Sequence, residues 1–138
     1  MSRSLMLLTV LLVAGCGVGA AVPSGPIPPW RSDIVAAQDE ASKAGRPMLL
    51  RFTASWCPPC QEMERSVWPT PEAQAALAPV AAIKVDVDDP AAETLARTYG
   101  IQGIPALVLV DASGREIARA TGFQRLEQVQ ALVSQAPR

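Results

Sequence analysis

Two cysteines three positions apart, Cys57 and Cys60, stand at the junction between two different hydrophobic patterns. The run 48–54 before them is apolar and strand-like, and the residues after Cys60 follow a helical pattern. Two thiols at this spacing can close a small reversible disulfide. At the start of a helix, backbone N–H groups and the helix dipole also stabilise a thiolate. The segment therefore predicts a strand, a turn and a helix that carry the chemistry of thiol–disulfide exchange.

The composition excludes several other functions. With 12 basic and 13 acidic residues, the formal charge of −1 gives no electrostatic basis for binding nucleic acid. The chain has no histidine, so a Cys–His protease dyad is impossible, and Gln61 follows Cys60 where c-type haem attachment needs histidine. Cys57 and Cys60 are too few for a zinc site, which needs about four ligands. We expect neither a metal nor a cofactor.

The N-terminus has the layout of a secretory signal. Arg3 precedes an apolar run, 5–14, that is about half the length needed to span a bilayer and ends in small residues. We predict a signal peptide over 1–15, a Pro/Gly-rich linker over 16–31 and one folded domain over 32–138. A buried N-terminal helix is the alternative, but the linker would isolate such a helix from the domain.

The residues 12–16, Leu-Val-Ala-Gly-Cys, resemble the lipobox of bacterial lipoproteins. The resemblance implies cleavage before Cys16, lipidation of Cys16, and a periplasmic or cell-envelope protein that meets the membrane only through its lipid. A cut after Ala20 would instead leave a soluble exported protein. On either route the mature domain keeps two thiols, and export suits a compartment where disulfides persist. The linker would hold the domain about 40 Å from a membrane, or serve only as a connection.

Periodicity and turn residues predict an α/β domain. A helix is expected from a Ser32 cap to Gly45, and a Thr70 cap and an Asp89 cap start two later helices. The other boundaries follow from Pro, Gly and alternating apolar residues. The predicted helices are 32–45, 61–68, 71–78, 89–99 and 124–135, and the predicted strands are 48–54, 80–86, 105–110 and 115–120. This order predicts a central mixed sheet of about four strands with helices on both faces, the first two strands parallel and the last two antiparallel.

This order of elements, with Trp-Cys-x-x-Cys after the first strand, resembles the thioredoxin-like fold. The segment 99–107, Tyr-Gly-Ile-Gln-Gly-Ile-Pro-Ala-Leu, resembles the thioredoxin segment that carries a cis-proline. The segment 118–123, Ala-Arg-Ala-Thr-Gly-Phe, resembles the end of the C-terminal domain of DsbD-type thiol:disulfide interchange proteins. The resemblance extends over about 35–134. Its specificity comes from finding the Ile-Pro segment some 45 residues after the cysteines, since Cys-x-x-Cys alone is a weak motif.

The resemblance implies a role for each residue of the site. An exposed Cys57 would attack the disulfide of a partner, and Cys60 would resolve the mixed disulfide. Ile104 and a cis Pro105 would lie against Cys57 and bind the substrate, together with Trp56 and Pro58. The cis bond rests on the resemblance, because only about 5–6% of X–Pro bonds are cis. For Trp56 a plain core or rim position stays open.

The residues between the cysteines bear on the direction of the reaction. If Cys57 is the N-cap, Pro59 has no N–H to offer, and the N–H of Cys60 is the local donor to the sulfur. No histidine lies between the cysteines, so the thiolate is only modestly stabilised and the couple should be comparatively reducing. We expect an exported monomer that reduces disulfide-containing envelope proteins and receives electrons from a membrane protein. The alternatives are an oxidase or isomerase of the same fold, and a non-enzymatic binding module with a structural disulfide.

Arg51 departs from the family pattern. Thioredoxins carry a buried aspartate six residues before the first cysteine, where it helps to move the proton of the resolving cysteine. Arg51 could form an ion pair with Asp86 on the neighbouring strand, favour the Cys60 thiolate directly, or extend into solvent. Glu62 and Glu64 are candidate proton acceptors or ordinary surface residues. Lys84 stands where the family often has its lysine.

The remaining apolar residues are expected to form the core, and the two other tryptophans have structural interpretations. Trp30 is expected to pack the linker onto the domain, and for Trp68 we favour packing at the end of the active-site helix over contact with partners. The expected core residues are Met48, Met63, Leu77, Leu95 and Leu107, with Leu126, Val129, Leu132 and Val133 from the last helix.

Overall fold

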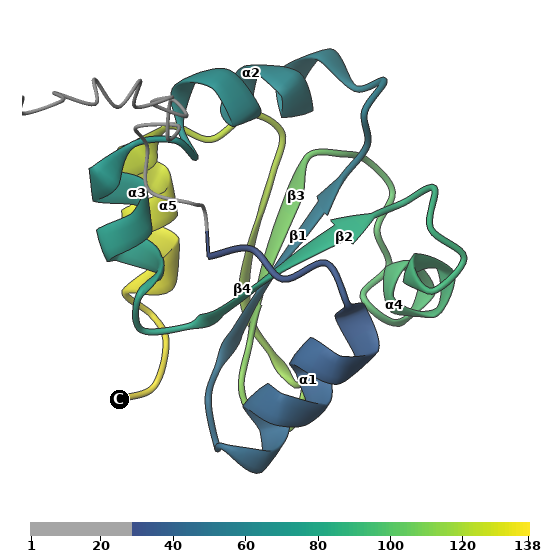
Figure 1. The fold of residues 1–138 in the computed structure, drawn as a ribbon, viewed down its shortest axis with the longest axis vertical. Helices are drawn as coiled ribbons and strands as arrows, with labels where there is room; N and C mark the ends of the chain where they lie inside the picture. The colour runs from purple at the N-terminus through teal and green to yellow at the C-terminus, as the bar shows by residue number, and fades with distance from the viewer. Residues whose placement is uncertain (1–28) are drawn as a thin grey trace, which may run out of the picture.

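A computed structural model describes residues 29–138 (Figure 1). The predicted signal peptide, the lipidation site Cys16 and most of the predicted linker lie outside the described residues. The elements in chain order are α1 (Ile34–Lys43), β1 (Met48–Thr53), α2 (Pro58–Ser66), α3 (Pro71–Leu77), β2 (Ala81–Asp86), α4 (Ala92–Thr98), β3 (Ala106–Val110), β4 (Glu116–Thr121) and α5 (Leu126–Val133). Among these residues no helix is both long and apolar enough to cross a membrane.

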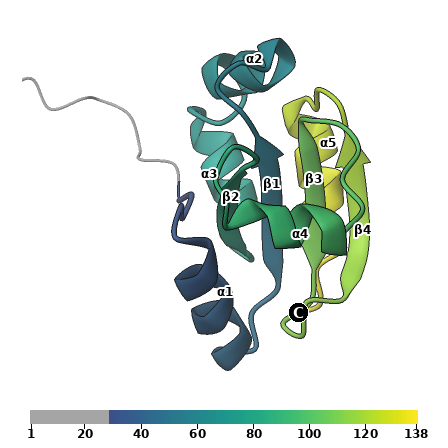
Figure 2. The ribbon, with the colours of Figure 1, turned by 90° about the vertical axis from the view of Figure 1, so that its right-hand side faces the viewer.

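The four strands form one mixed sheet in the order β2-β1-β3-β4. β1 pairs in parallel with β2 and antiparallel with β3, which in turn pairs antiparallel with β4. α1 and α4 cover one face, and α2, α3 and α5 cover the other (Figure 2). The predicted fold class, pairing and two-sided cover are therefore confirmed.

The central strand β1 is buried along its whole length because helices cover both faces of the sheet. Leu50 and Phe52 face α1 and α4, whereas Leu49 belongs to the cluster under α2, α3 and α5. Arg51 points to the same side as Leu49, as the period of a strand requires. It is the one charged residue among the buried residues of the described chain.

The predicted core residues are buried, and Leu126 alone among them is only partly covered. Four helix starts differ from the predicted ranges, and one of them is α2, which begins at Pro58 instead of at residue 61. Asp33 rather than Ser32 caps α1, because its carboxylate accepts the N–H of Ala36 at 3.0 Å. The Asp89 carboxylate accepts the N–H of Ala91 in a turn that precedes α4, so Asp89 is not the N-cap of that helix. α5 begins at Leu126, two residues later than expected. Local hydrogen bonds of polar side chains decide such boundaries, and several candidates stand close together in the sequence.

Trp30 and Arg31 tie the segment before α1 to the edge of the sheet. The N–H of Arg31 donates to the carbonyl of Ala82 at 2.9 Å, and the N–H of Lys84 donates to the carbonyl of Arg31 at 2.8 Å. The Trp30 ring meets the Trp68 ring edge to face, with 4.9 Å between centroids. Trp68 is itself fully buried. The packing roles expected for Trp30 and Trp68 are confirmed.

Candidate active site

The two cysteines occupy the first turn of α2, directly after the buried strand β1. Cys57 is the N-cap, and its sulfur accepts the backbone N–H of Cys60 at 3.3 Å. Pro58 and Pro59 fill the first two helical positions, where a missing N–H costs no helical hydrogen bond. The N–H of Gln61 then donates to the carbonyl of Cys57 at 3.0 Å. The expected cap, with Cys60 as the donor, is confirmed.

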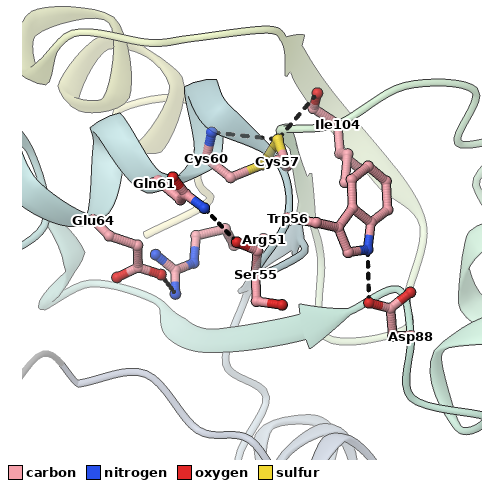
Figure 3. Close-up of a disulfide and its surroundings, with 9 residues drawn as sticks. All are labelled: Arg51, Ser55, Trp56, Cys57, Cys60, Gln61, Glu64, Asp88 and Ile104. Atoms are coloured by element: carbon pink, nitrogen blue, oxygen red, sulfur yellow. Dashed lines mark hydrogen bonds and ion pairs between the residues drawn. A yellow bond between two sulfur atoms is a disulfide. The ribbon is translucent and has the colours of Figure 1, made fainter.

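Cys57 and Cys60 form a disulfide (Figure 3), and their Cα atoms are 5.2 Å apart. The expectation that Cys57 is exposed is wrong for this oxidised form, because both cysteines keep only 3% of their surface accessible. The sulfurs lie in a small apolar cluster with Ala54, and Val87 and Ile104 pack against it. A partner must therefore reach the disulfide past the residues around it.

The Ile104–Pro105 peptide bond is cis, as the resemblance implied. It lies beside the disulfide, since the carbonyl oxygen of Ile104 is 3.7 Å from the sulfur of Cys57. Pro105 is buried and anchored by its carbonyl, which accepts the N–H of Gly122 at 2.8 Å. Ile104 is half-buried. Of this pair, Ile104 is thus the residue that contributes surface to the site.

The exposed rim of the disulfide is apolar. Trp56 is 62% exposed, so the core position left open for it is wrong, and Pro58 is exposed beside it. The indole N–H of Trp56 donates to a carboxylate oxygen of Asp88 at 2.8 Å (Figure 3). No local sequence pattern indicates this partner, because Asp88 lies in the turn after β2. The only signal is that β1 and β2 are parallel neighbours, so the residues that follow the two strands lie close together.

A second exposed aromatic residue was also missed. Phe123 is 40% exposed and directly follows Gly122, which bonds to Pro105. The pairing of Ala106 with Thr121 brings the start of β3 to the end of β4 and places this loop beside the cis-proline. Phe123 ends the segment 118–123, whose resemblance to DsbD-type domains gives no information on whether this side chain is exposed.

Arg51 is buried, and two of its three expected arrangements are wrong. Its residue is only 3% exposed, so it does not extend into solvent. Its Nη2 forms an ion pair with Oε1 of Glu64 at 2.9 Å instead of pairing with Asp86. The guanidinium carbon also lies 4.4 Å from the centroid of the Trp30 ring and 5.2 Å from that of Trp68. Burial lowers the pKa of Arg51 below its usual value, and the negative charge of Glu64 opposes that shift.

The two candidate proton acceptors differ in position. The Glu64 side chain is 44% exposed and engages the buried Arg51, whereas Glu62 pairs with Arg65 on the exposed side of α2 at 2.7 Å. Glu62 thus matches the surface interpretation. Glu64 shares a cavity of about 230 Å³ with Lys84 and other polar residues between α2 and the end of β2.

Comparison with known proteins agrees with this geometry. Residues 34–137 match the profile of a family described as a thioredoxin-like domain. The thiol:disulfide interchange protein DsbD of Ralstonia nicotianae is 36% identical over 99 residues, which cover 70% of this chain and 16% of that relative. The reduced C-terminal domain of DsbD from Neisseria meningitidis superimposes with a TM-score of 0.64 and 28% identity, covering 74% of this chain and 92% of that chain. A thioredoxin from Thermus thermophilus gives a TM-score of 0.65 and 26% identity, covering 77% and 84%.

The fold, the disulfide at the start of α2 and these relatives define the class as thiol–disulfide oxidoreductases. The chain belongs to the thioredoxin-like domain family and is similar to the C-terminal domain of DsbD. It spans 16% of the length of the Ralstonia relative, so the likeness concerns one domain of that protein.

Proposed function

We propose that this protein reduces disulfides of other exported proteins through its Cys57–Cys60 couple. The observation that carries the proposal is the disulfide itself, which lies at the N-terminus of α2 against a cis-proline loop and beneath an apolar exposed rim. The similarity to a domain of DsbD, a thiol:disulfide interchange protein, supports the same reaction class.

The proposed reaction starts from the dithiol form. The thiolate of Cys57 attacks one sulfur of a partner disulfide, and the other partner sulfur leaves as a thiolate and takes up a proton. The thiolate of Cys60 then attacks the sulfur of Cys57, which restores the Cys57–Cys60 disulfide and releases the second partner sulfur, again to be protonated. Two electrons pass from the cysteine pair to the partner. A further reductant, for which we propose a membrane protein with an exposed thiol pair, must return them.

The rim around Cys57 is the proposed substrate-binding surface. Trp56, Pro58 and Ile104 offer apolar surface, and Pro105 fixes the loop that carries Ile104. An extended partner segment could pair with the backbone at Ile104 in the manner of an added strand. The binding of Trp56 to Asp88 holds the indole at the rim before the partner arrives.

The local donors support the reducing direction. The sulfur of Cys57 receives one N–H, from Cys60, and the intervening prolines add none. A weakly stabilised thiolate accompanies a reducing couple, such as thioredoxin at about −270 mV, rather than an oxidant such as DsbA at about −120 mV. A redox titration of the couple decides between reductase and oxidase or isomerase, because a potential near that of DsbA would reverse the direction.

We also propose export, a lipid anchor at Cys16 and action as a monomer.

The first test is insulin reduction with dithiothreitol as the electron source. We expect the parent protein and a Cys16→Ser variant to be equally active, and Cys57→Ser to be inactive because the attacking sulfur is gone. Full activity of Cys57→Ser would contradict the proposal.

The 3% exposure of both cysteines favours a second candidate, a binding module in which the disulfide is a fixed crosslink. That candidate predicts a pair that stays oxidised in millimolar glutathione and partner binding that does not depend on redox state. Reduction of the pair under these conditions would exclude it.

A further inference from the structure

The core beneath α2 contains a group of polar donors that lack acceptors. The indole Nε1 of Trp30 and both Nε and Nη1 of Arg51 are buried without a hydrogen-bond partner in the described chain. Arg51 uses only Nη2, in its ion pair with Glu64, although its side chain is only 4% exposed. Buried donors without acceptors are costly, and an arginine stays charged at any physiological pH. The oxidised protein thus holds a cation that is only partly satisfied.

The position of this cation relates it to Cys60. Glu64 follows Cys60 by four residues on α2, so the two side chains share one face of that helix. Cys60 is buried, and the guanidinium of Arg51 meets Glu64 at 2.9 Å under the same helix. Figure 3 shows the Arg51 side chain below this part of α2, with its guanidinium next to Glu64 and the disulfide higher in the view. The charge of Arg51 therefore lies on the core side of α2, at the residue one helical turn after Cys60.

We propose that Arg51 is a positioning residue that keeps Cys60 in its thiolate form for the second step of exchange. The inference rests on the proposed function, since Cys60 must be free of the disulfide to ionise. In the dithiol form, and in the mixed disulfide in which Cys57 holds the partner, the sulfur of Cys60 is not part of a disulfide and lies in this core. Its thiolate then supplies a negative acceptor near donors that have none in the oxidised form. The proton of Cys60 passes to solvent, and the thiolate supplies the electron pair that forms the new bond to Cys57.

Glu64 sets how much of the positive charge reaches Cys60. Its carboxylate neutralises part of the guanidinium charge. The other groups that cover the guanidinium are the ring faces of Trp30 and Trp68, which carry no charge at any pH. Other charged groups reach this region from β2. Lys84 is the register partner of Arg51, and both Lys84 and Asp86 line the same cavity as Glu64. Removing Arg51 and removing the charge of Glu64 must therefore shift the pKa of Cys60 in opposite directions.

The test measures the pKa of Cys60 in the full-length chain with Cys16→Ser and Cys57→Ala, so that one thiol remains. Thiolate absorbance is followed against pH. We expect Arg51→Met to lower the ionisation constant of Cys60 by about tenfold, because the Arg51 charge is buried on the core side of α2. We expect Glu64→Gln to raise it by about tenfold, because the Glu64 carboxylate stands one helical turn from Cys60. Arg51→Lys should keep most of the parent value, because it retains the charge.

Glu62→Gln is the matched control. It removes the same charge from the same helix, but Glu62 faces solvent and pairs with Arg65. We expect it to leave the ionisation of Cys60 within about twofold of the parent. Chemical denaturation of each variant shows which of them fold. A purely structural role for Arg51 predicts that Arg51→Met and Glu64→Gln both lower stability without opposite shifts of the Cys60 pKa.

Opposite shifts from Arg51→Met and Glu64→Gln would support the inference. Shifts in the same direction, or Glu64→Gln matching Glu62→Gln, would overturn it. If Arg51→Met does not fold, the comparison of Glu64→Gln with Glu62→Gln decides alone. The test is independent of the proposed function, because Cys60 can be titrated in the single-thiol chain even if the Cys57–Cys60 couple proves inert toward partners.

Discussion

The two cysteines of the disulfide lie in different surroundings although their Cα atoms are only 5.2 Å apart. Cys57 faces the neutral cis-proline loop, next to the exposed Trp56. Cys60 starts the inner face of α2, which continues to Glu64 and the buried charge of Arg51. The exchange reaction needs two steps with different demands, and the difference suggests that each sulfur is adapted to one of them.

The comparison indicates how such a site can change without losing its reaction. In the rim around Cys57, Trp56 and Ile104 are loop residues, which can vary to suit a partner, and Pro58 belongs to the first turn of α2. The residues on the core side of Cys60 lie between α2 and the sheet. When a buried side chain is replaced there, its neighbours must compensate for the change in volume or charge. Arg51 shows this, because its burial is accompanied by Glu64 and by two tryptophans that cover the guanidinium.

The largest expected effect separates the two cysteines directly. Cys60→Ala removes the resolving thiolate but leaves Cys57 able to attack, so turnover in insulin reduction should fall by about a hundredfold or more. The variant should also accumulate partners as mixed disulfides that dithiothreitol releases. Non-reducing electrophoresis followed by mass spectrometry measures this, with Cys57→Ser as the control that traps nothing. Equal trapping by both variants would show that the cysteines do not divide the steps as proposed.

The second prediction concerns the buried side. Trp68 is 1% exposed, follows the C-terminal end of α2 and packs against both Trp30 and Arg51. Trp68→Ala should lower the free energy of unfolding by about 3–5 kcal/mol, the usual cost of removing a large aromatic side chain from a core. Urea denaturation followed by circular dichroism measures the change. A loss below about 1 kcal/mol would mean that the cover over Arg51 is not part of the stable core.

Much of this arrangement could be predicted from local sequence patterns. The cap at Cys57 follows from the spacing of Cys57, Pro59 and Cys60, which are neighbours in the chain. The strand pairing follows from alternating apolar runs and from the order of the elements. The cis bond before Pro105 required a resemblance, because the local sequence alone gives a low frequency of cis bonds.

The contacts that could not be predicted join segments that are far apart in the sequence. Strand register places Lys84 beside Arg51, which made a partner on β2 plausible for the arginine. The true partner, Glu64, is on α2, and only the angle at which that helix crosses β1 brings it close. The burial of Cys57 has the same origin, because the covering carbonyl of Ile104 comes from a loop 47 residues later. Neither contact has a short-range sequence signal.

The third prediction tests the exposed side with the same residue type. Trp56 is 62% exposed, so Trp56→Ala should change the free energy of unfolding by no more than about 0.5 kcal/mol. It should instead raise the KM for insulin by about tenfold, because an exposed tryptophan at a binding surface often carries much of the affinity. Steady-state kinetics and urea denaturation together measure both effects. A large loss of stability with an unchanged KM would assign Trp56 to the fold rather than to the partner.

The smallest expected effect comes from the carboxylate that holds Trp56 in place. Asp88→Ala removes the acceptor of the indole N–H but leaves the ring, so the KM should rise by only about threefold, in line with the loss of one exposed hydrogen bond. Asp89→Ala is the matched control, since the Asp89 carboxylate bonds to the backbone of Ala91 instead of to Trp56. If Asp88→Ala raised the KM as much as Trp56→Ala, the orientation of the ring rather than its surface would determine binding. If the KM of Asp88→Ala equalled that of Asp89→Ala, partner binding would not depend on the hydrogen bond between Trp56 and Asp88. Binding at the rim around Cys57 would then not depend on contacts with the end of β2, the strand that carries Lys84 and Asp86.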